Sequence, residues 1–204
     1  MRAVPVEIHI SESLVLRGER YGEGGERWAI LVHEEGRDLD AWRRLLRPLL
    51  ELGLTALAFD LPGHGVSTGS WEPGRLPGYL LAVLDYAASQ GAGSLYLIGA
   101  GAGATAAVAA AGEREVQAIV ALSPLAELPG VPAEALRESA APKLIIAGSE
   151  DGTRAEEAAD VYGRAIGWGV LQTAPVAAQG TYLLESEWAE HVAEATIGFL
   201  RDYL

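Results

Sequence analysis

A glycine-dense stretch in the middle of the chain constrains the fold most strongly. Residues 94–111 read SLYLIGAGAGATAAVAAA. The stretch begins with an apolar run that is typical of a buried strand, passes through Gly99, Gly101 and Gly103, and continues into small helix-forming residues. A buried strand that turns directly into a helix predicts an α/β protein, because this connection leads from a parallel sheet to a covering helix.

Alternating strand and helix patterns continue on both sides of this stretch. Residues 4–10 alternate apolar and polar side chains, which predicts a half-buried strand, and residues 14–20 are expected to pair with it as a hairpin. Apolar runs predict further strands at residues 28–32, 54–59, 95–98, 116–122, 143–147 and 170–173. Helices are predicted at residues 38–53, 79–89, 102–111, 155–166 and 187–203, and at most a short helix at residues 133–139. Asp38 is expected to cap the first helix and Gly53 to end it, while Pro48 is expected to bend or interrupt it.

This order of elements predicts one α/β domain over residues 1–204. Repeated strand–helix units imply a mostly parallel sheet of about eight strands with helices on both faces, preceded by an antiparallel N-terminal hairpin. Only residues 123–138 separate two of the predicted strands at the place where a lid domain would be inserted. We therefore expect no lid domain.

Composition excludes several kinds of partner and site. The formal net charge of −13 would repel phosphate backbones, which argues against a nucleic-acid partner. The chain has no cysteine, so disulfides and cysteine-based metal sites are excluded. No apolar run approaches the roughly 18 residues of a membrane helix, and residues 1–5 lack the apolar segment of a signal peptide. We therefore expect a soluble, cytoplasmic protein that does not bind membranes.

Five segments in chain order resemble motifs of the α/β-hydrolase superfamily. Residues 59–67 (FDLPGHGVS) resemble the family's D-x-P-G-x-G-x-S loop, and residues 97–104 resemble the G-x-S-x-G nucleophile elbow. Residues 30–33 resemble the strand before the oxyanion loop, residues 142–151 the segment with the catalytic acid, and residues 177–184 the loop with the catalytic histidine. The resemblance covers nearly the whole chain. It implies a three-layer α/β-hydrolase fold like that of small members without a lid, such as serine esterases and dienelactone hydrolases.

The resemblance places Gly101, Asp151 and Gln179 at the family's serine, acid and histidine positions. Gly101 has no side chain to attack a carbonyl, and the amide of Gln179 cannot act as a base near neutral pH. Losing the serine or the histidine of such a triad alone removes about 10⁶-fold of activity in a serine protease. A laboratory substitution at position 101 would have left histidine at position 179, so we expect a natural double loss.

Glycine at position 101 has a conformational advantage once catalysis is absent. The nucleophile of an elbow sits in a strained backbone conformation, where a residue with a Cβ atom costs about 1 kcal/mol or more. We therefore expect Gly101 to relieve strain and Gly101→Ser to lower the melting temperature.

Further residues are candidates to line a cleft around Gly101. They are His33, Glu34, Glu35, His64, Ala102 and Ser123. The two carboxylates would oppose negative charge at an oxyanion site; either both point to solvent, or one turns inward and joins Asp151 around a ligand with positive charge or several hydroxyl donors. The histidines are expected to support loop packing, and Ser123 to form a turn after a strand.

Two other readings of these residues carry less weight. No ligand spacing supports a metal site built from His33, Glu34 and Asp151, and we expect neither a metal nor a cofactor. The glycines at 99, 101 and 103 lack the final spacing of the dinucleotide motif G-x-G-x-x-G.

The sequence thus favours a non-catalytic protein that binds a small molecule or another protein through the former active-site cleft. The alternative is a serine-hydrolase-family esterase with weak or unconventional activity. A purely structural subunit is a third possibility, and the oligomeric state is left open.

Overall fold

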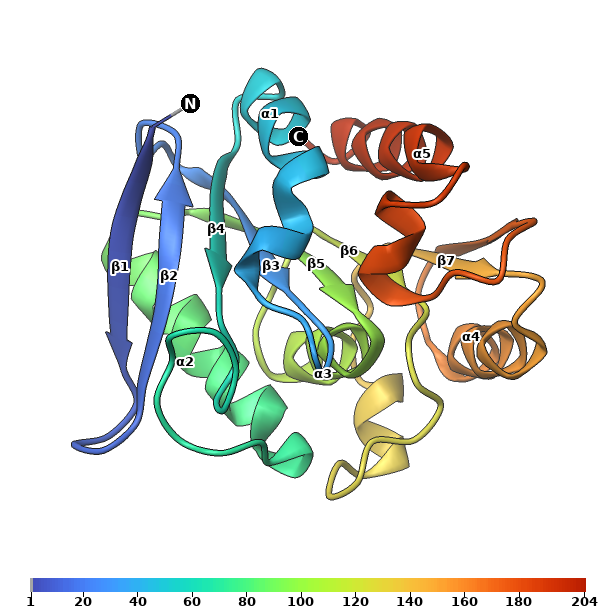
Figure 1. Ribbon diagram of the computed structural model, residues 1–204, viewed down its shortest axis with the longest axis horizontal. Coiled ribbons are helices and arrows are strands. Elements are labelled where there is room, and N and C mark those ends of the chain that lie inside the picture. Colours follow the sequence, from blue (N-terminus) through green and yellow to red (C-terminus); the bar gives the residue numbers. More distant parts are fainter. Residues whose placement is uncertain (1) are drawn as a thin grey trace.

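An eight-stranded sheet forms the centre of the computed structural model, which describes residues 2–204 (Figure 1). The strand order is β1-β2-β4-β3-β5-β6-β7-β8. The strands are β1 (Ala3–His9), β2 (Val15–Tyr21), β3 (Arg27–Val32), β4 (Thr55–Phe59), β5 (Ser94–Ala100), β6 (Ala118–Leu122), β7 (Lys143–Gly148) and β8 (Gly169–Ala174). β1 pairs with β2 and β2 with β4 in antiparallel fashion, whereas all pairs from β4 to β8 are parallel. The predicted fold class is confirmed.

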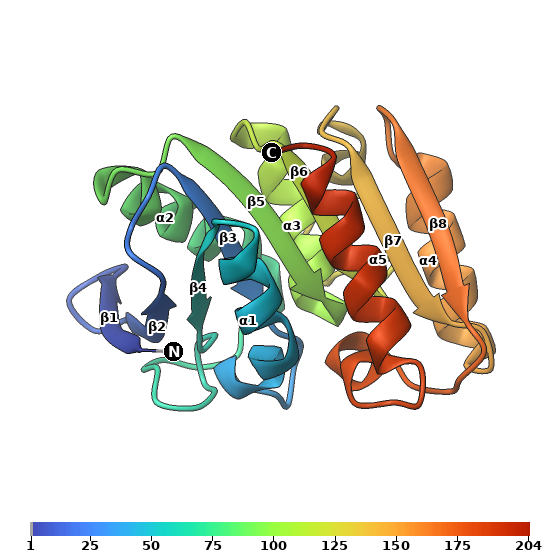
Figure 2. The ribbon, with the colours of Figure 1, turned by 90° about the horizontal axis from the view of Figure 1, so that it is seen from above.

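Helices cover both faces of the sheet, which gives three layers (Figure 2). The α-helices are α1 (Arg43–Glu51), α2 (Leu76–Ser89), α3 (Gly101–Glu113), α4 (Gly152–Arg164) and α5 (Ala189–Arg201). The 3-10 helices are η1 (Leu39–Trp42), η2 (Pro73–Arg75), η3 (Ala133–Arg137) and η4 (Gly180–Leu184). Side chains of α2, α3 and α4 share one apolar core, and those of α1 and α5 share the other.

The side chains of β5 contribute alternately to the two cores. Leu97 belongs to the core beneath α2, α3 and α4, whereas its neighbours Tyr96 and Ile98 belong to the core beneath α1 and α5. Successive side chains of a strand point to opposite faces, so a strand covered on both sides has to be apolar throughout. The continuous apolar runs of the sequence therefore correspond to the central strands.

Of the bend or interruption predicted at Pro48, the interruption is wrong. Pro48 lies inside α1, which continues to Glu51, and the break in the predicted helix lies earlier, where η1 passes into α1. A proline removes the bond to the carbonyl four residues before it, here that of Arg44 in the first turn of α1. Because the loss falls close to the start of the helix, the remaining turns form normally. The short helix predicted within residues 133–139 is present as the 3-10 helix η3.

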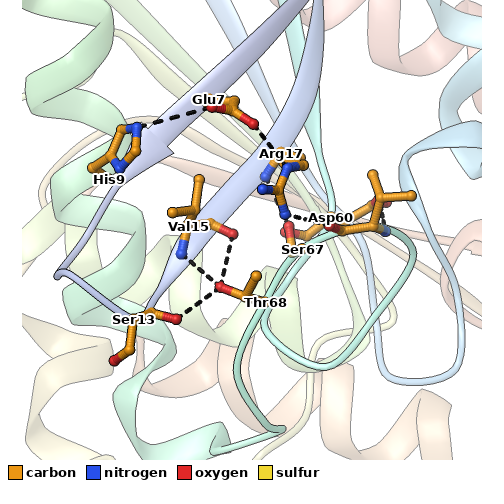
Figure 3. Close-up of polar contacts among 9 residues, drawn as sticks. Glu7, His9, Ser13, Val15, Arg17, Asp60, Ser67 and Thr68 are labelled. Carbon is orange, nitrogen blue, oxygen red and sulfur yellow. Dashed lines mark hydrogen bonds and ion pairs between the residues drawn. The ribbon is translucent and has the colours of Figure 1, made fainter.

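Residues 60–68 form a loop that is fastened to β2 by polar contacts (Figure 3). Ser67 Oγ donates to the carbonyl of Asp60 (2.6 Å) and accepts from the backbone N–H of Arg17 (2.8 Å). The buried Asp60 carboxylate accepts from the N–H groups of Leu39 and Val66, both at 2.9 Å. The residues that resemble the D-x-P-G-x-G-x-S motif therefore hold this loop against β2 and the start of η1.

Within residues 2–204, no helix combines the length and the apolar character needed to span a membrane.

Candidate functional site

The candidate site lies where three parallel strands end. β5 leads into Gly101, β3 leads into His33, and β6 leads into Ser123. β5 lies between β3 and β6 in the sheet, so the three segments that follow these strands are neighbours. Ligands of open α/β sheets bind at this carboxyl edge.

A cavity of about 200 Å³ opens at this edge. Its lining comprises Glu34, Glu35, Gly101, Ala102, Ser123, Leu125, Arg154, Gln179, Gly180 and Tyr182. The structure thus brings together most of the residues that the sequence nominates for a cleft. His33, His64 and Asp151 lie outside this lining.

Glu34 lies between the serine and histidine positions of the family pattern. Gly101 has φ +51°, and a Cβ atom built on it would lie 2.8 Å from the Cβ atom of Glu34. Gly180, next to Gln179, has φ +53°, and a Cβ atom there would lie 2.6 Å from Glu34 Oε1. Both glycines therefore have left-handed backbones and leave room for the same acidic side chain.

Glu34 turns inward, while Glu35 is exposed. Glu34 Oε1 accepts hydrogen bonds from the backbone N–H (2.9 Å) and from Oγ1 (2.7 Å) of the buried Thr181. Glu34 Oε2 is buried and has no hydrogen-bond partner among residues 2–204. One carboxylate thus enters the cleft, but it is held by Thr181 and does not share a contact with Asp151.

Arg154 connects the acid and histidine positions. Asp151 caps α4, where its Oδ1 accepts from the backbone N–H of Arg154 (3.2 Å). Arg154 Nε donates to Gln179 Oε1 (2.6 Å), and its guanidinium also pairs with Glu157. The amide of Gln179 is therefore directed at a cation. No motif in the sequence signals Arg154, whereas Gly180 and Tyr182 lie in the segment that resembles the histidine loop.

His33 is fully buried and hydrogen-bonded through both ring nitrogens. The N–H of Leu61 donates to Nε2 (2.9 Å), so Nδ1 carries the proton and donates to the carbonyl of Glu34 (2.7 Å). Burial lowers the pKa of His33 to about 4, and the neutral ring is the form present near neutral pH. His33 thus holds the backbone of Glu34 through the hydrogen bond to its carbonyl, and His33 itself does not line the cavity.

His64 is engaged in the same way. The N–H of Gly36 donates to its Nε2 (3.0 Å), so Nδ1 donates to the carbonyl of Pro62 (3.1 Å). Its ring contacts those of His33 and Trp71 edge-on, with centroids 5.2 Å and 5.1 Å apart. Both histidines therefore support loop packing in this structure.

Ser123 is the one residue other than glycine with a left-handed backbone among residues 2–204, at φ +47°. Its side chain is 1% exposed, and Oγ has no hydrogen-bond partner within the described chain. Its N–H donates to the carbonyl of Ile146 (2.7 Å), which holds the backbone in place. A strained, buried serine with a free hydroxyl lining a cavity is typical of functional sites.

The site is rich in hydrogen-bond acceptors and has one cation. Glu34, Glu35, Ser123 and Gln179 bring oxygen atoms to the lining, and Arg154 brings a guanidinium. Glu34 Oε2 and Ser123 Oγ are both buried without a hydrogen-bond partner among residues 2–204. Within residues 2–204, no group of three or more histidine, aspartate and glutamate side chains is arranged to hold a metal ion.

Comparisons with known proteins identify the family. Residues 29–201 match the model of the alpha/beta hydrolase family. No curated protein matches the chain. Among solved structures, the esterase Pf2001 of Pyrococcus furiosus is 22% identical, with a TM-score of 0.80 over 99% of this chain and 93% of the other.

Two further structures are similar over both chains. Est1E from Butyrivibrio proteoclasticus, solved with ferulic acid bound, is 19% identical, with a TM-score of 0.84 over 97% of this chain and 98% of the other. A dienelactone hydrolase from Anabaena variabilis is 23% identical, with a TM-score of 0.82 over 100% of this chain and 98% of the other. At these identities the structures establish the shared fold. The family model covers most of the chain, and the protein belongs to the alpha/beta hydrolase family.

Proposed function

We propose that this protein is a non-catalytic α/β hydrolase that binds a small molecule in the cavity beside Gly101. The observation that carries the proposal is the position of Glu34, which occupies the space that a side chain at position 101 would need. A cavity of about 200 Å³ suits a small molecule better than a segment of a protein partner.

The residues at the triad positions support a loss of hydrolysis. Gly101 supplies no Oγ, and the side-chain oxygen of Gln179 is bonded to Arg154. Asp151 caps α4 and has no imidazole to orient. Acyl transfer needs both a nucleophile and a base that removes its proton, and neither position offers one.

A second candidate is an esterase of unconventional design that uses Ser123. The observation in its favour is the left-handed backbone of Ser123 combined with its unpartnered hydroxyl, in a residue that lines the cavity. Against it, the ring nitrogens of His33 and His64 are engaged away from the cavity, so no imidazole is placed to activate the serine.

A fluorophosphonate probe and a panel of p-nitrophenyl esters separate the two candidates. We expect no covalent labelling, and ester turnover equal to that of the Ser123→Ala variant. Labelling or turnover that Ser123→Ala abolishes would establish the second candidate and overturn the first.

A further inference from the structure

Strand β8 forms one edge of the sheet, opposite the edge formed by β1 (Figure 2). The N–H of Lys143 donates to the carbonyl of Trp168 (3.0 Å), and the N–H of Ser149 donates to the carbonyl of Ala174 (2.7 Å). Both carbonyls thus point towards β7 and the residues that follow it. Because the direction of the backbone groups alternates along a strand, the even-numbered residues of this segment bond to β7 and the odd-numbered ones point away.

The outward-pointing backbone groups of β8 belong to Gly169, Leu171 and Thr173. Among residues 2–204, one of these groups has a further contact, the carbonyl of Gly169, which accepts from the Tyr162 hydroxyl at 3.4 Å. The edge of β8 is therefore a row of donors and acceptors that a further strand could pair with.

The two edges of the sheet differ in how they are protected against such pairing. Native edge strands usually carry prolines or charged side chains that prevent pairing with another chain. β1 contains both, as Pro5 and Glu7, whereas β8 (GVLQTA) contains neither. The sequence of β8 thus favours pairing.

Exposed apolar side chains gather beside this unprotected edge. Three of the six large apolar side chains that are exposed among residues 2–204 lie between the end of α4 and the start of β8, namely Tyr162, Ile166 and Trp168. Trp168 is 57% exposed and directly precedes β8, and its ring stacks on that of Phe199 in α5 (centroids 6.0 Å apart). Clustered exposed apolar side chains mark interaction surfaces.

From these features we infer that β8 pairs antiparallel with β8 of a second copy of this chain. The two copies form a twofold dimer in which the two sheets become one. Antiparallel pairing of identical edges closes on itself, because a twofold axis makes each surface its own partner. The surface lies outside the cavity beside Gly101, so the inference does not depend on the proposed function.

The outward-pointing groups define the register of the pair. All three outward residues of both copies are used when Leu171 lies opposite Leu171 of the second copy and Gly169 lies opposite Thr173. Each opposed pair then exchanges two backbone hydrogen bonds. No charged side chains face each other in this register, since β8 has none.

The same register brings Trp168 to a groove on the second copy. Trp168 lies opposite Ala174, and their side chains lie on the α5 face of the sheet, where Ala174 is part of the core beneath α5. A groove of about 350 Å³ lies there, and its lining includes Ala174, Trp188 and Val192. The exposed indole of each copy thus fits the groove of the other, and a tryptophan in a groove is a common anchor of protein interfaces.

The charge of the chain explains why the contact lies at this edge. Two copies with −13 each repel one another at long range, so a contact between them has to avoid like charges. On α4, next to β8, the exposed residues Ala159, Tyr162 and Gly163 lie on one face at spacings of three and four and are uncharged. Added salt screens the repulsion and should tighten the dimer.

Light scattering during size-exclusion chromatography of the full chain tests the inference. At micromolar concentration we expect twice the mass of 21.4 kDa. Thr173→Pro removes an outward N–H and should raise the dissociation constant at least tenfold, whereas Thr173→Val keeps the N–H and should leave the constant unchanged. Trp168→Ala should also raise it at least tenfold. Val66→Ala removes an exposed apolar side chain elsewhere and should have no effect; melting curves show that each variant is folded.

Single cysteines test the register, since the chain has no cysteine of its own. Opposed residues of such a pair have Cα atoms about 5.5 Å apart, a separation that a disulfide spans. Leu171→Cys should therefore give a covalent dimer under oxidation with copper phenanthroline. The two copies of Thr173 are offset by four residues, roughly 13 Å, so Thr173→Cys should give none.

Three results would overturn the inference. A mass of one chain at micromolar concentration excludes the dimer and leaves the edge of β8 to a strand of a different protein. A dimer that Thr173→Pro and Trp168→Ala leave intact uses another surface. A disulfide in Thr173→Cys without one in Leu171→Cys excludes the twofold pairing about Leu171.

Discussion

Glu34 lies directly against the backbone of Gly101, so that a Cβ atom built on Gly101 would approach the Glu34 Cβ atom to 2.8 Å. Real Cβ atoms essentially never come this close to another atom. The residue at the nucleophile position and the residue after His33 therefore depend on each other. A side chain at one position requires the other to move.

Gly101→Ser should lower the melting temperature without creating esterase activity. Two effects add at this position, the left-handed φ of +51° and the contact with Glu34. A left-handed backbone at a residue with a side chain lowers the free energy of unfolding by about 1–3 kcal/mol. Thermal unfolding monitored by circular dichroism gives the result, and a melting temperature equal to or above that of the wild type would contradict it.

Two control variants separate strain from contact. Gly53 has φ +79° and open space around its Cβ position, so Gly53→Ser reports backbone strain alone. The Gly101→Ser/Glu34→Gly double variant has no Cβ atom at position 34, so any stability that it regains over Gly101→Ser, relative to Glu34→Gly alone, reports the contact. If Gly101→Ser is no more destabilising than Gly53→Ser, the contact with Glu34 is unimportant.

The buried His33 should make the protein less stable as the pH falls below about 6.5. Burial lowers the pKa of His33 from 6.5 to about 4 in the folded state, so the unfolded chain takes up the proton first. The full contribution to the unfolding free energy is present above pH 6.5 and is lost as the pH falls to about 4, a change of roughly 3 kcal/mol.

Urea unfolding of the wild type and of His33→Gln at several pH values checks this. The difference in unfolding free energy between the two proteins should shrink steadily between pH 6.5 and pH 4, since titration of the carboxylates is common to both. The exposed His9 serves as control through His9→Gln. A difference that stays constant with pH would show that His33 titrates normally.

The fold could be predicted because its signals are local. The apolar runs, the glycines of residues 99–103 and the motif of residues 59–67 each lie in one continuous segment. The structure explains the last motif: a Cβ atom at Gly65 would lie 1.9 Å from Asp60 Oδ2, so the aspartate requires the glycine. Such short-range dependence is visible in a sequence.

The inner surface of the site could not be predicted because its contacts join distant segments. Glu34 bonds Thr181 across 147 positions of the chain, and Arg154 bonds Gln179 across 25. Nothing in the local pattern distinguishes the inward Glu34 from the exposed Glu35. The left-handed backbone of Ser123 is equally hidden, since it depends on the neighbouring strand β7 through the carbonyl of Ile146.

Lys143, the only lysine of the chain, should make the protein more stable as the pH rises above about 8. Its buried Nζ donates to the carbonyls of Ser139 (2.6 Å), Ala141 (2.7 Å) and Ile166 (3.0 Å). Burial lowers the pKa of Lys143 to about 8 from 10.5, so between these values the unfolded chain binds more protons than the folded one. Stability then rises with pH by at most about 1.4 kcal/mol per unit.

The Lys143→Met variant isolates this contribution. The free energy of unfolding is measured for both proteins at pH 7.5, 8.5 and 9.5. The value for the wild type minus the value for the variant should increase with pH. The tyrosines with raised pKa values, Tyr21, Tyr79, Tyr96 and Tyr203, titrate in both proteins and cancel. A difference that falls with pH would mean that the three carbonyls keep Lys143 charged.

Restoring the triad residues alone should not restore ester hydrolysis. In Gly101→Ser/Gln179→His, Glu34 still occupies the space beside the new serine, and Arg154 still lies against position 179, where it opposes the imidazolium that forms during acyl transfer. We expect p-nitrophenyl acetate turnover at the wild-type level.

Adding Glu34→Gly and Arg154→Ala removes both obstacles and should raise turnover at least tenfold. Asp151→Asn in this quadruple variant should lower the turnover again, because Asp151 would orient the new histidine. Turnover by the double variant alone would show that Glu34 and Arg154 leave the former active site open, and would weaken the case that its geometry has been reorganised for binding.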